Sequence, residues 1–210
     1  MPAPQRALVV IDAQQEYFEG LLQIGYPPRE ESLARTLDAL RAAENAGIPV
    51  VIVQHESPEG APVFAKGSGT GQLHPEIAVH AETASKHVVK NYGSVFAATD
   101  LETWLRGEGI DTITLTGYMT NNCVLASAAA AEPLGFAVEV LSDATGAINI
   151  TNEAGSASAR QVHETLMALL NSNWAAVSTT TVWAGAVERG DALTPSNLIV
   201  SAAAEVQTTR

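Results

Sequence analysis

The chain has 210 residues, of which 46% are hydrophobic and 16% charged, which excludes a disordered polymer and predicts one packed domain. Its 11 Lys and Arg against 23 Asp and Glu residues give a formal net charge of −12, so nucleic acid and anionic membranes are poor partners. Cys123 is the one cysteine, which excludes an intrachain disulfide; with no membrane-spanning apolar run and no export signal, a cytoplasmic protein is expected.

Apolar runs of strand length alternate with segments of helical period, a pattern typical of an α/β fold with a mostly parallel sheet. In the first half of the chain we expect strands over residues 7–11, 49–54 and 87–90, and a helix over 30–46. Residues 56–73 are rich in Gly, Pro and Ser and show no period, so they predict a long loop. The sequence leaves open whether this loop is a lid with glycine hinges or a simple mobile loop.

The second half continues the same alternation. Thr99 and Glu102 have the spacing of a capping box, which predicts that a helix begins just after Thr99. Further strands are expected over 112–116, 137–141 and 175–182, and further helices over 123–131 and 161–170. We therefore predict a domain over residues 1–187 and a C-terminal extension over 188–210, which is either a disordered tail or an arm packing on another subunit.

Three chemically active side chains fall at the expected carboxyl edge of the sheet, where open α/β sheets bind ligands. Asp12 follows the first strand, Lys90 ends the third, and Cys123 follows the fourth at the start of a helix. The helix N-terminus and Lys90 would both lower the pKa of the thiol, so Cys123 is a candidate thiolate whose proton a carboxylate takes and returns. From position alone, the alternative is structural: a buried apolar cysteine, a capping aspartate and a solvated lysine.

Three segments in this order resemble the signature regions of the isochorismatase-like cysteine hydrolase superfamily. They read ALVVIDAQQEYF, KNYGSVFAATDL, and TGYMTNNCVLASAAAAEPLGF followed by VEVLSDAT. The superfamily includes nicotinamidases, N-carbamoylsarcosine amidase and streptothricin hydrolase, and the similarity extends from about residue 6 to residue 182. The resemblance implies a three-layer α/β fold with a six-stranded, mostly parallel sheet flanked by helices. It also implies a homo-oligomer, either a dimer or a tetramer.

Carried over residue by residue, the resemblance implies that Cys123 is the nucleophile, Asp12 the general base and Lys90 the cation that holds the pair in its charged arrangement. The Tyr118–Met119 bond falls where the family has a non-proline cis peptide, so that the N–H groups of Met119 and Cys123 would form an oxyanion hole. The substrate pocket is expected to be lined by Gln14, Tyr17, Phe64 and Tyr118.

No cofactor and no metal are expected. Metal-dependent nicotinamidases carry an Asp-x-His pattern with a second His after strand two, but here the corresponding stretch reads VQHES. His55, His74 and Glu76 are the residues left that could gather around a zinc ion, although scattered histidines are more often ordinary polar residues.

The predicted function is therefore a metal-independent cysteine amidohydrolase that cleaves a C–N bond of a small amide, lactam or carbamoyl compound through a thioester. Two alternatives stay open. One is isochorismatase-type vinyl-ether hydrolysis, in which an aspartate acts as acid and no thiol is needed; Cys123 argues against it. The other is a catalytically silent chain that keeps the fold and acts as a binding subunit.

Overall fold

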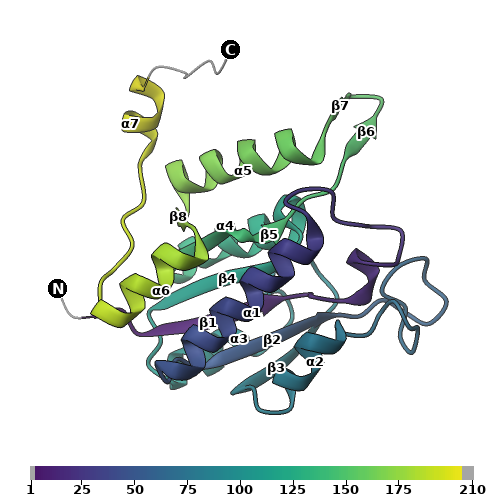
Figure 1. The fold of residues 1–210 in the computed structure, drawn as a ribbon, viewed down its shortest axis with the longest axis horizontal. Coiled ribbons are helices and arrows are strands. Elements are labelled where there is room, and N and C mark those ends of the chain that lie inside the picture. The colour runs from purple at the N-terminus through teal and green to yellow at the C-terminus, as the bar shows by residue number, and fades with distance from the viewer. Residues whose placement is uncertain (1–2, 205–210) are drawn as a thin grey trace.

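A six-stranded sheet organises residues 3–204, the part of the chain that the computed structural model describes (Figure 1). Its strand order is β3-β2-β1-β4-β5-β8, and all neighbouring pairs are parallel. The strands are β1 (Arg6–Ile11), β2 (Val50–His55), β3 (Lys86–Lys90), β4 (Thr112–Tyr118), β5 (Ala137–Gly146) and β8 (Ala176–Ser178). The predicted α/β fold with a six-stranded parallel sheet is thus confirmed.

Helices cover both faces of this sheet and produce three layers. The helices over residues 3–204 are η1 (Gln15–Tyr17), α1 (Arg29–Asn45), α2 (Pro75–Ala81), α3 (Leu101–Gly107), η2 (Thr120–Val124), α4 (Leu125–Leu134), α5 (Ala159–Asn173), α6 (Thr180–Arg189) and α7 (Leu198–Ala203), of which α7 lies off the sheet. The odd residues of β1 pack with α3, α4 and α5, whereas Leu8 and Val10 pack with α1, α2 and α6. Because β1 is buried on both faces, it reads as an uninterrupted apolar run.

Gly117 lets β4 approach β1 at the edge of the sheet where both strands end. A Cβ at this position would lie 2.1 Å from the backbone oxygen of Ile11, and the residue has a φ of +89°. Only glycine fits both conditions without displacing backbone. The close approach brings the chain that follows β4 next to Asp12, which follows β1 directly.

Two predicted boundaries differ from the observed ones. The strand expected over 175–182 ends at Ser178, because Thr179 accepts a hydrogen bond from the N–H of Val182 and begins α6. Burial of Trp183 on α6 outweighs the strand preference of the β-branched residues before it. Asp100, not Thr99, is the N-cap residue of α3, but its side chain forms no capping hydrogen bond. The Thr99 hydroxyl donates to the Val95 carbonyl at 2.6 Å and accepts from the N–H of Leu101, the first residue of α3, at 3.4 Å.

Several elements extend or complete the predicted set. The helix expected over 123–131 is entered through the π-helical turn η2, which contains Cys123, and continues as α4 to Leu134. The structure adds α2 and a two-stranded hairpin, β6 (Ile150–Asn152) and β7 (Gly155–Ala157). The boundary predicted between 187 and 188 falls in the last turn of α6.

The C-terminal extension contains α7, which Figure 1 shows above α5 at the end of an extended segment. Leu198, Ile199 and Val200 on this short helix are exposed. Residues 205–210 of the predicted extension lie outside the described residues. Over residues 3–204, none of the helices has the length and hydropathy that crossing a bilayer requires.

Candidate active site

Asp12, Lys90 and Cys123 meet at the carboxyl edge of the sheet. The Lys90 Nζ lies 2.7 Å from the Asp12 Oδ2 and donates a hydrogen bond of 3.3 Å to the Cys123 Sγ. The three residues are 0%, 1% and 3% exposed, respectively. The structure therefore brings together all three residues that the sequence nominated as a catalytic set.

The parallel sheet explains why residues so far apart in sequence converge. β1 lies between β2 and β4, and β3 pairs with β2, so the chain leaves all four strands at the same edge. Asp12 has a φ of 48° and its N–H donates to the Val53 carbonyl at 2.9 Å, which anchors the turn after β1 to β2. Cys123 reaches the edge from η2, the turn that follows β4.

The ammonium group of Lys90 has two more partners besides Asp12 and Cys123. It donates to the Tyr92 carbonyl at 3.0 Å, and it lies 3.2 Å from the His55 Nδ1. An ammonium carries three N–H donors and no acceptor. All three donors of Lys90 are thus used inside the protein.

The ionisation of Cys123 differs from the expectation of a ready thiolate. Burial, followed by the negative charge of Asp12, raises the pKa of the Cys123 thiol to about 12, although Lys90 acts in the opposite direction. Burial also raises the pKa of Asp12 above its usual value, and again Lys90 opposes the change. The resting site is therefore an Asp12–Lys90 ion pair beside a neutral thiol. Loss of water around the sulfur outweighs the attraction of Lys90, on which the prediction partly relied.

The segment that would supply the oxyanion hole contains a cis peptide bond between Tyr118 and Met119. The Met119 carbonyl accepts hydrogen bonds from the N–H groups of Asn122 and Val124, at 3.1 Å and 3.2 Å. These bonds close the turn that carries Cys123. The roles of the Met119 and Cys123 N–H groups toward an oxyanion stay predictions.

Gln14 is fully buried and holds backbone segments together at the rim of the site. Its Nε2 donates to the carbonyls of His55 and Gly71 at 2.9 Å and 2.7 Å, and its Oε1 accepts from the His55 N–H at 2.8 Å. Because both of its N–H donors are taken, Gln14 joins β2 to the 56–73 loop and leaves no free donor for a substrate. The structure thus gives this predicted pocket residue a positioning role.

Three aromatic side chains predicted for the pocket pack against one another. The Tyr17 ring centroid lies 5.3 Å from that of Phe64 and 5.3 Å from that of Tyr118. Burial, followed by the negative charge of Asp12, raises the pKa of the Tyr17 phenol. The Tyr118 hydroxyl is paired with the Ser32 Oγ at 2.8 Å, so this side chain reaches into α1.

Phe64 connects the 56–73 loop to the site. Its ring also lies 5.1 Å from the His55 ring, and it is only 7% exposed. Backbone hydrogen bonds between Ser57 and both Phe64 and Lys66, of 2.9 Å and 3.0 Å, give the loop a defined shape. The loop therefore places an aromatic side chain against His55, which lies next to Lys90.

His55 belongs to the site, although the sequence suggested it only as a possible metal ligand. It is the last residue of β2, at the edge that carries Asp12 and Lys90, so the strand-end rule that selected those residues applies to it equally. Burial and the charge of Lys90 lower the pKa of His55 to about 4. At neutral pH its Nδ1 is therefore an acceptor for the Lys90 ammonium.

The possible zinc ligands do not gather. His74 lies at the start of α2, where its Nδ1 accepts from the Glu76 N–H at 3.3 Å and its ring packs 4.5 Å from that of Phe18. Within the described part of the chain, no three His, Cys, Asp or Glu side chains are arranged to hold a metal ion. His55 faces Lys90 instead.

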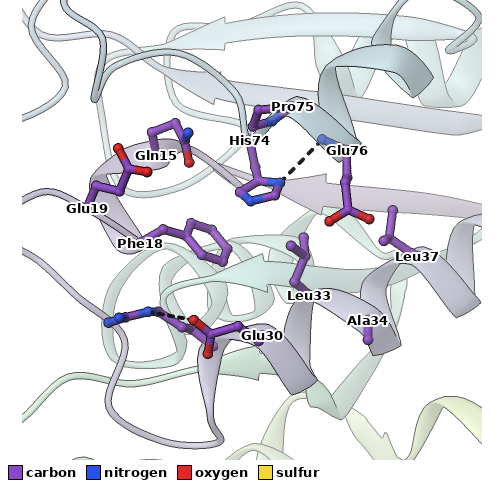
Figure 2. A pocket seen from close by; sticks show the side chains of 11 residues that line it. Gln15, Phe18, Glu19, Glu30, Leu33, Ala34, Leu37, His74, Pro75 and Glu76 are labelled. Atoms are coloured by element: carbon purple, nitrogen blue, oxygen red, sulfur yellow. Dashed lines mark hydrogen bonds and ion pairs between the residues drawn. The ribbon is translucent and has the colours of Figure 1, made fainter.

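His74 and Phe18 line a separate, open cleft of about 570 Å³ between η1, α1 and α2 (Figure 2). Leu33 and Leu37 of α1 form its apolar wall, and Glu76 lies at its rim. None of the three catalytic candidates lines it. This cleft is therefore separate from the buried set of Asp12, Lys90 and Cys123.

Comparisons with known proteins agree with this architecture. The Isochorismatase domain family matches residues 6–181. The chain is 38% identical over 140 residues to the secreted isochorismatase effector Isc1 of Verticillium dahliae, covering 66% of this chain and 71% of that protein. It is 30% identical over 152 residues to a streptothricin hydrolase of Streptomyces noursei, covering 72% and 58%. A crystal structure of a candidate isochorismatase from Burkholderia xenovorans LB400 superposes with a TM-score of 0.93 at 45% identity, covering 95% of each chain.

Proposed function

The chain belongs to the isochorismatase family of hydrolases, and on that basis we propose that it is a metal-independent cysteine amidohydrolase. It would cleave a C–N bond of a small amide, lactam or carbamoyl compound through a thioester intermediate. One observation carries the proposal: the Lys90 ammonium lies 3.3 Å from the buried Cys123 sulfur and 2.7 Å from the Asp12 carboxylate. These groups are a positioning cation, a nucleophile and a base.

The reaction begins with proton transfer. Asp12 takes the proton from the Cys123 Sγ, and the sulfur attacks the substrate carbonyl carbon, so that a C–S bond forms as the carbonyl oxygen gains negative charge. The N–H groups of Met119 and Cys123 stabilise that oxyanion. Asp12 then gives its proton to the departing nitrogen as the C–N bond breaks. Water attacks the thioester with Asp12 again as base, which releases the acid and restores the thiol.

The electrostatics of the resting site suit this sequence. A neutral thiol does not hold a second negative charge beside Asp12 before substrate arrives. A carboxylate whose pKa is raised by burial accepts a thiol proton more readily than an ordinary aspartate does. Lys90 stays next to both groups, so it stabilises the negative charge whichever of them carries it.

The streptothricin hydrolase relative supports C–N bond cleavage, whereas the Isc1 relative favours a second candidate, isochorismatase-type vinyl-ether hydrolysis. In that reaction Asp12 would act as an acid and the thiol would be unnecessary. The contact between Cys123 and Lys90 favours the amidohydrolase, because it gives the sulfur a partner that stabilises its anion.

The test is ammonia release from a panel of small amides and lactams by the wild-type chain and by Cys123→Ala and Cys123→Ser. We expect turnover only from the wild type, with circular dichroism and melting temperature showing that both variants stay folded. Wild-type rates in Cys123→Ala would overturn the thiol mechanism. Hydrolysis of isochorismate, undiminished in Cys123→Ala, would establish the second candidate.

We also propose that the chain forms a homo-oligomer in the cytoplasm and that its partner there is a small-molecule substrate. The exposed apolar residues of α7, Leu198, Ile199 and Val200, support the assembly, since a short helix with this surface gains stability when it packs. Light scattering on the full chain and on a chain truncated after residue 194 tests it: a dimer or tetramer is expected, and a full-length monomer contradicts it.

A further inference from the structure

We infer that this site takes amides without a carboxylate, with an uncharged or cationic acyl part. The inference rests on the proposed function and names the substrate class of the same site. The strongest hydrogen bonds to a carboxylate in proteins come from cationic donors, above all Arg or Lys. Whether the site can bind a substrate carboxylate therefore depends on which cations of this chain lie near it and what they already bind.

The cation inside the site has no free donor. Lys90 directs its three N–H groups to four neighbours: Asp12, Cys123, the Tyr92 carbonyl and His55. A substrate carboxylate could bind this ammonium only by displacing one of them. Displacing Asp12 or Cys123 would disable the proposed chemistry.

Over residues 3–204, the charge of every other cation is also compensated by a carboxylate of the chain. Each of the ten Lys and Arg residues between positions 3 and 204 already forms an ion pair with a carboxylate of the chain. The pairs are Arg6–Glu139, Arg29–Glu30, Arg35–Asp38, Arg41–Asp38, Lys66–Glu56, Lys86–Asp100, Lys90–Asp12, Arg106–Glu102, Arg160–Glu164 and Arg189–Asp191. Lys66 is on the 56–73 loop, and its Nζ lies 3.0 Å from the Glu56 Oε1.

The remaining charges around the site are negative or absent. Glu16 precedes Tyr17 in η1 and is buried, with its Oε1 accepting from the Leu21 N–H at 2.7 Å. His55 is neutral at physiological pH. The Phe64 ring packs against both Tyr17 and His55. A substrate carboxylate that enters the site would lose its hydration, form no ion pair with a free cation and lie near the negative charges of Asp12 and Glu16. An apolar or cationic acyl group would instead contact aromatic rings.

Two thiol reagents of nearly equal size test this without knowledge of the substrate: neutral iodoacetamide and anionic iodoacetate. In each, the Cys123 sulfur displaces iodide, so that a C–S bond forms, the C–I bond breaks and the thiol proton passes to Asp12 or to water. Cys123 is the one cysteine of the chain, so each label reports on this site. The ratio of the two alkylation rates is measured for the folded chain and divided by the same ratio for the chain unfolded in urea.

We expect the folded chain to favour iodoacetamide at least tenfold more strongly than the unfolded chain does. Asn122→Lys places a cation at the exposed residue that directly precedes Cys123 in the chain, and Asn122→Gln is its uncharged control. The lysine variant should reduce the preference by about threefold or more, and the glutamine variant should leave it unchanged.

Three outcomes would each overturn a different claim. An equal or greater preference for iodoacetate in the folded wild type would overturn the inference and leave a thiol hydrolase in place. A preference that Asn122→Lys does not change would overturn the electrostatic explanation on which the inference depends. A folded chain whose Cys123 reacts with neither reagent would contradict the proposed function itself, and the inference with it.

Discussion

The Lys90 ammonium and the Asp12 carboxylate form an ion pair of 2.7 Å in which neither side chain is accessible to solvent. Two charges buried together cost desolvation energy, which their mutual attraction offsets only while both are present. The pair therefore links stability to the site: removing one partner leaves the other charge buried alone.

The first prediction follows from this coupling. Asp12→Asn and Lys90→Met should each lower the free energy of unfolding by about 3–5 kcal/mol, whereas the double variant should lose much less than the sum. Urea unfolding of the wild type, the two single variants and the double variant completes the cycle. Additive losses would show that the two charges do not stabilise each other.

The second prediction concerns pH. The proposed base, Asp12, must be ionised, so kcat/KM should fall as pH decreases through its pKa, which burial raises above 3.8. Lys90 opposes that rise, so its removal should raise the pKa of Asp12 further. The pH below which kcat/KM falls should therefore be higher in Lys90→Met than in the wild type. It should rise less in Lys90→Arg, which keeps the charge. A fall at the same pH in all three proteins would exclude Asp12 as the titrating base.

The third prediction concerns Phe64, which packs on Tyr17 and on His55, the neighbour of Lys90. Phe64→Ala removes this ring, so iodoacetamide should alkylate Cys123 several-fold faster and KM should increase more than kcat changes. Glu59→Ala, an exposed position in the same loop, is the control and should behave as the wild type. Unchanged alkylation in Phe64→Ala would show that the ring does not limit access to the thiol.

The fourth prediction compares two glycines. Gly117→Ala places a Cβ 2.1 Å from the Ile11 carbonyl oxygen at a φ of +89°, so it should destabilise the chain by roughly 3 kcal/mol or more and impair the site next to Asp12. Gly107→Ala, in α3 with open space around its Cβ, should be neutral or slightly stabilising. Thermal melts compare the two, and equal effects would contradict the account of the β1–β4 contact.

The sequence was sufficient for the sheet and for the convergence of the three candidates. The uninterrupted apolar run of β1 and the rule that parallel strands end at one edge placed Asp12, Lys90 and Cys123 together, and the family resemblance assigned a role to each. These inferences depend on periodicity and topology, which are local in the sequence or follow from a small set of fold rules.

What the sequence could not supply depends on burial and on individual side-chain contacts. The expected low pKa of Cys123 was wrong because the loss of water around the sulfur is a property of the packed fold. Gln14 was placed in the pocket by analogy, yet its amide bonds to backbone on two elements. Thr179 begins a helix inside an apparent strand because Trp183, four residues later, finds a buried position in the core.

The central claim, that the Cys123 sulfur is the nucleophile, has one most direct measurement. The wild-type chain is alkylated progressively with iodoacetamide, and the fraction of Cys123 carrying the label, from intact-mass spectrometry, is compared with the remaining rate of amide hydrolysis. The account predicts that activity falls in proportion to labelling and reaches zero at one label per chain, with substrate slowing both. Turnover that persists in fully labelled protein would contradict it.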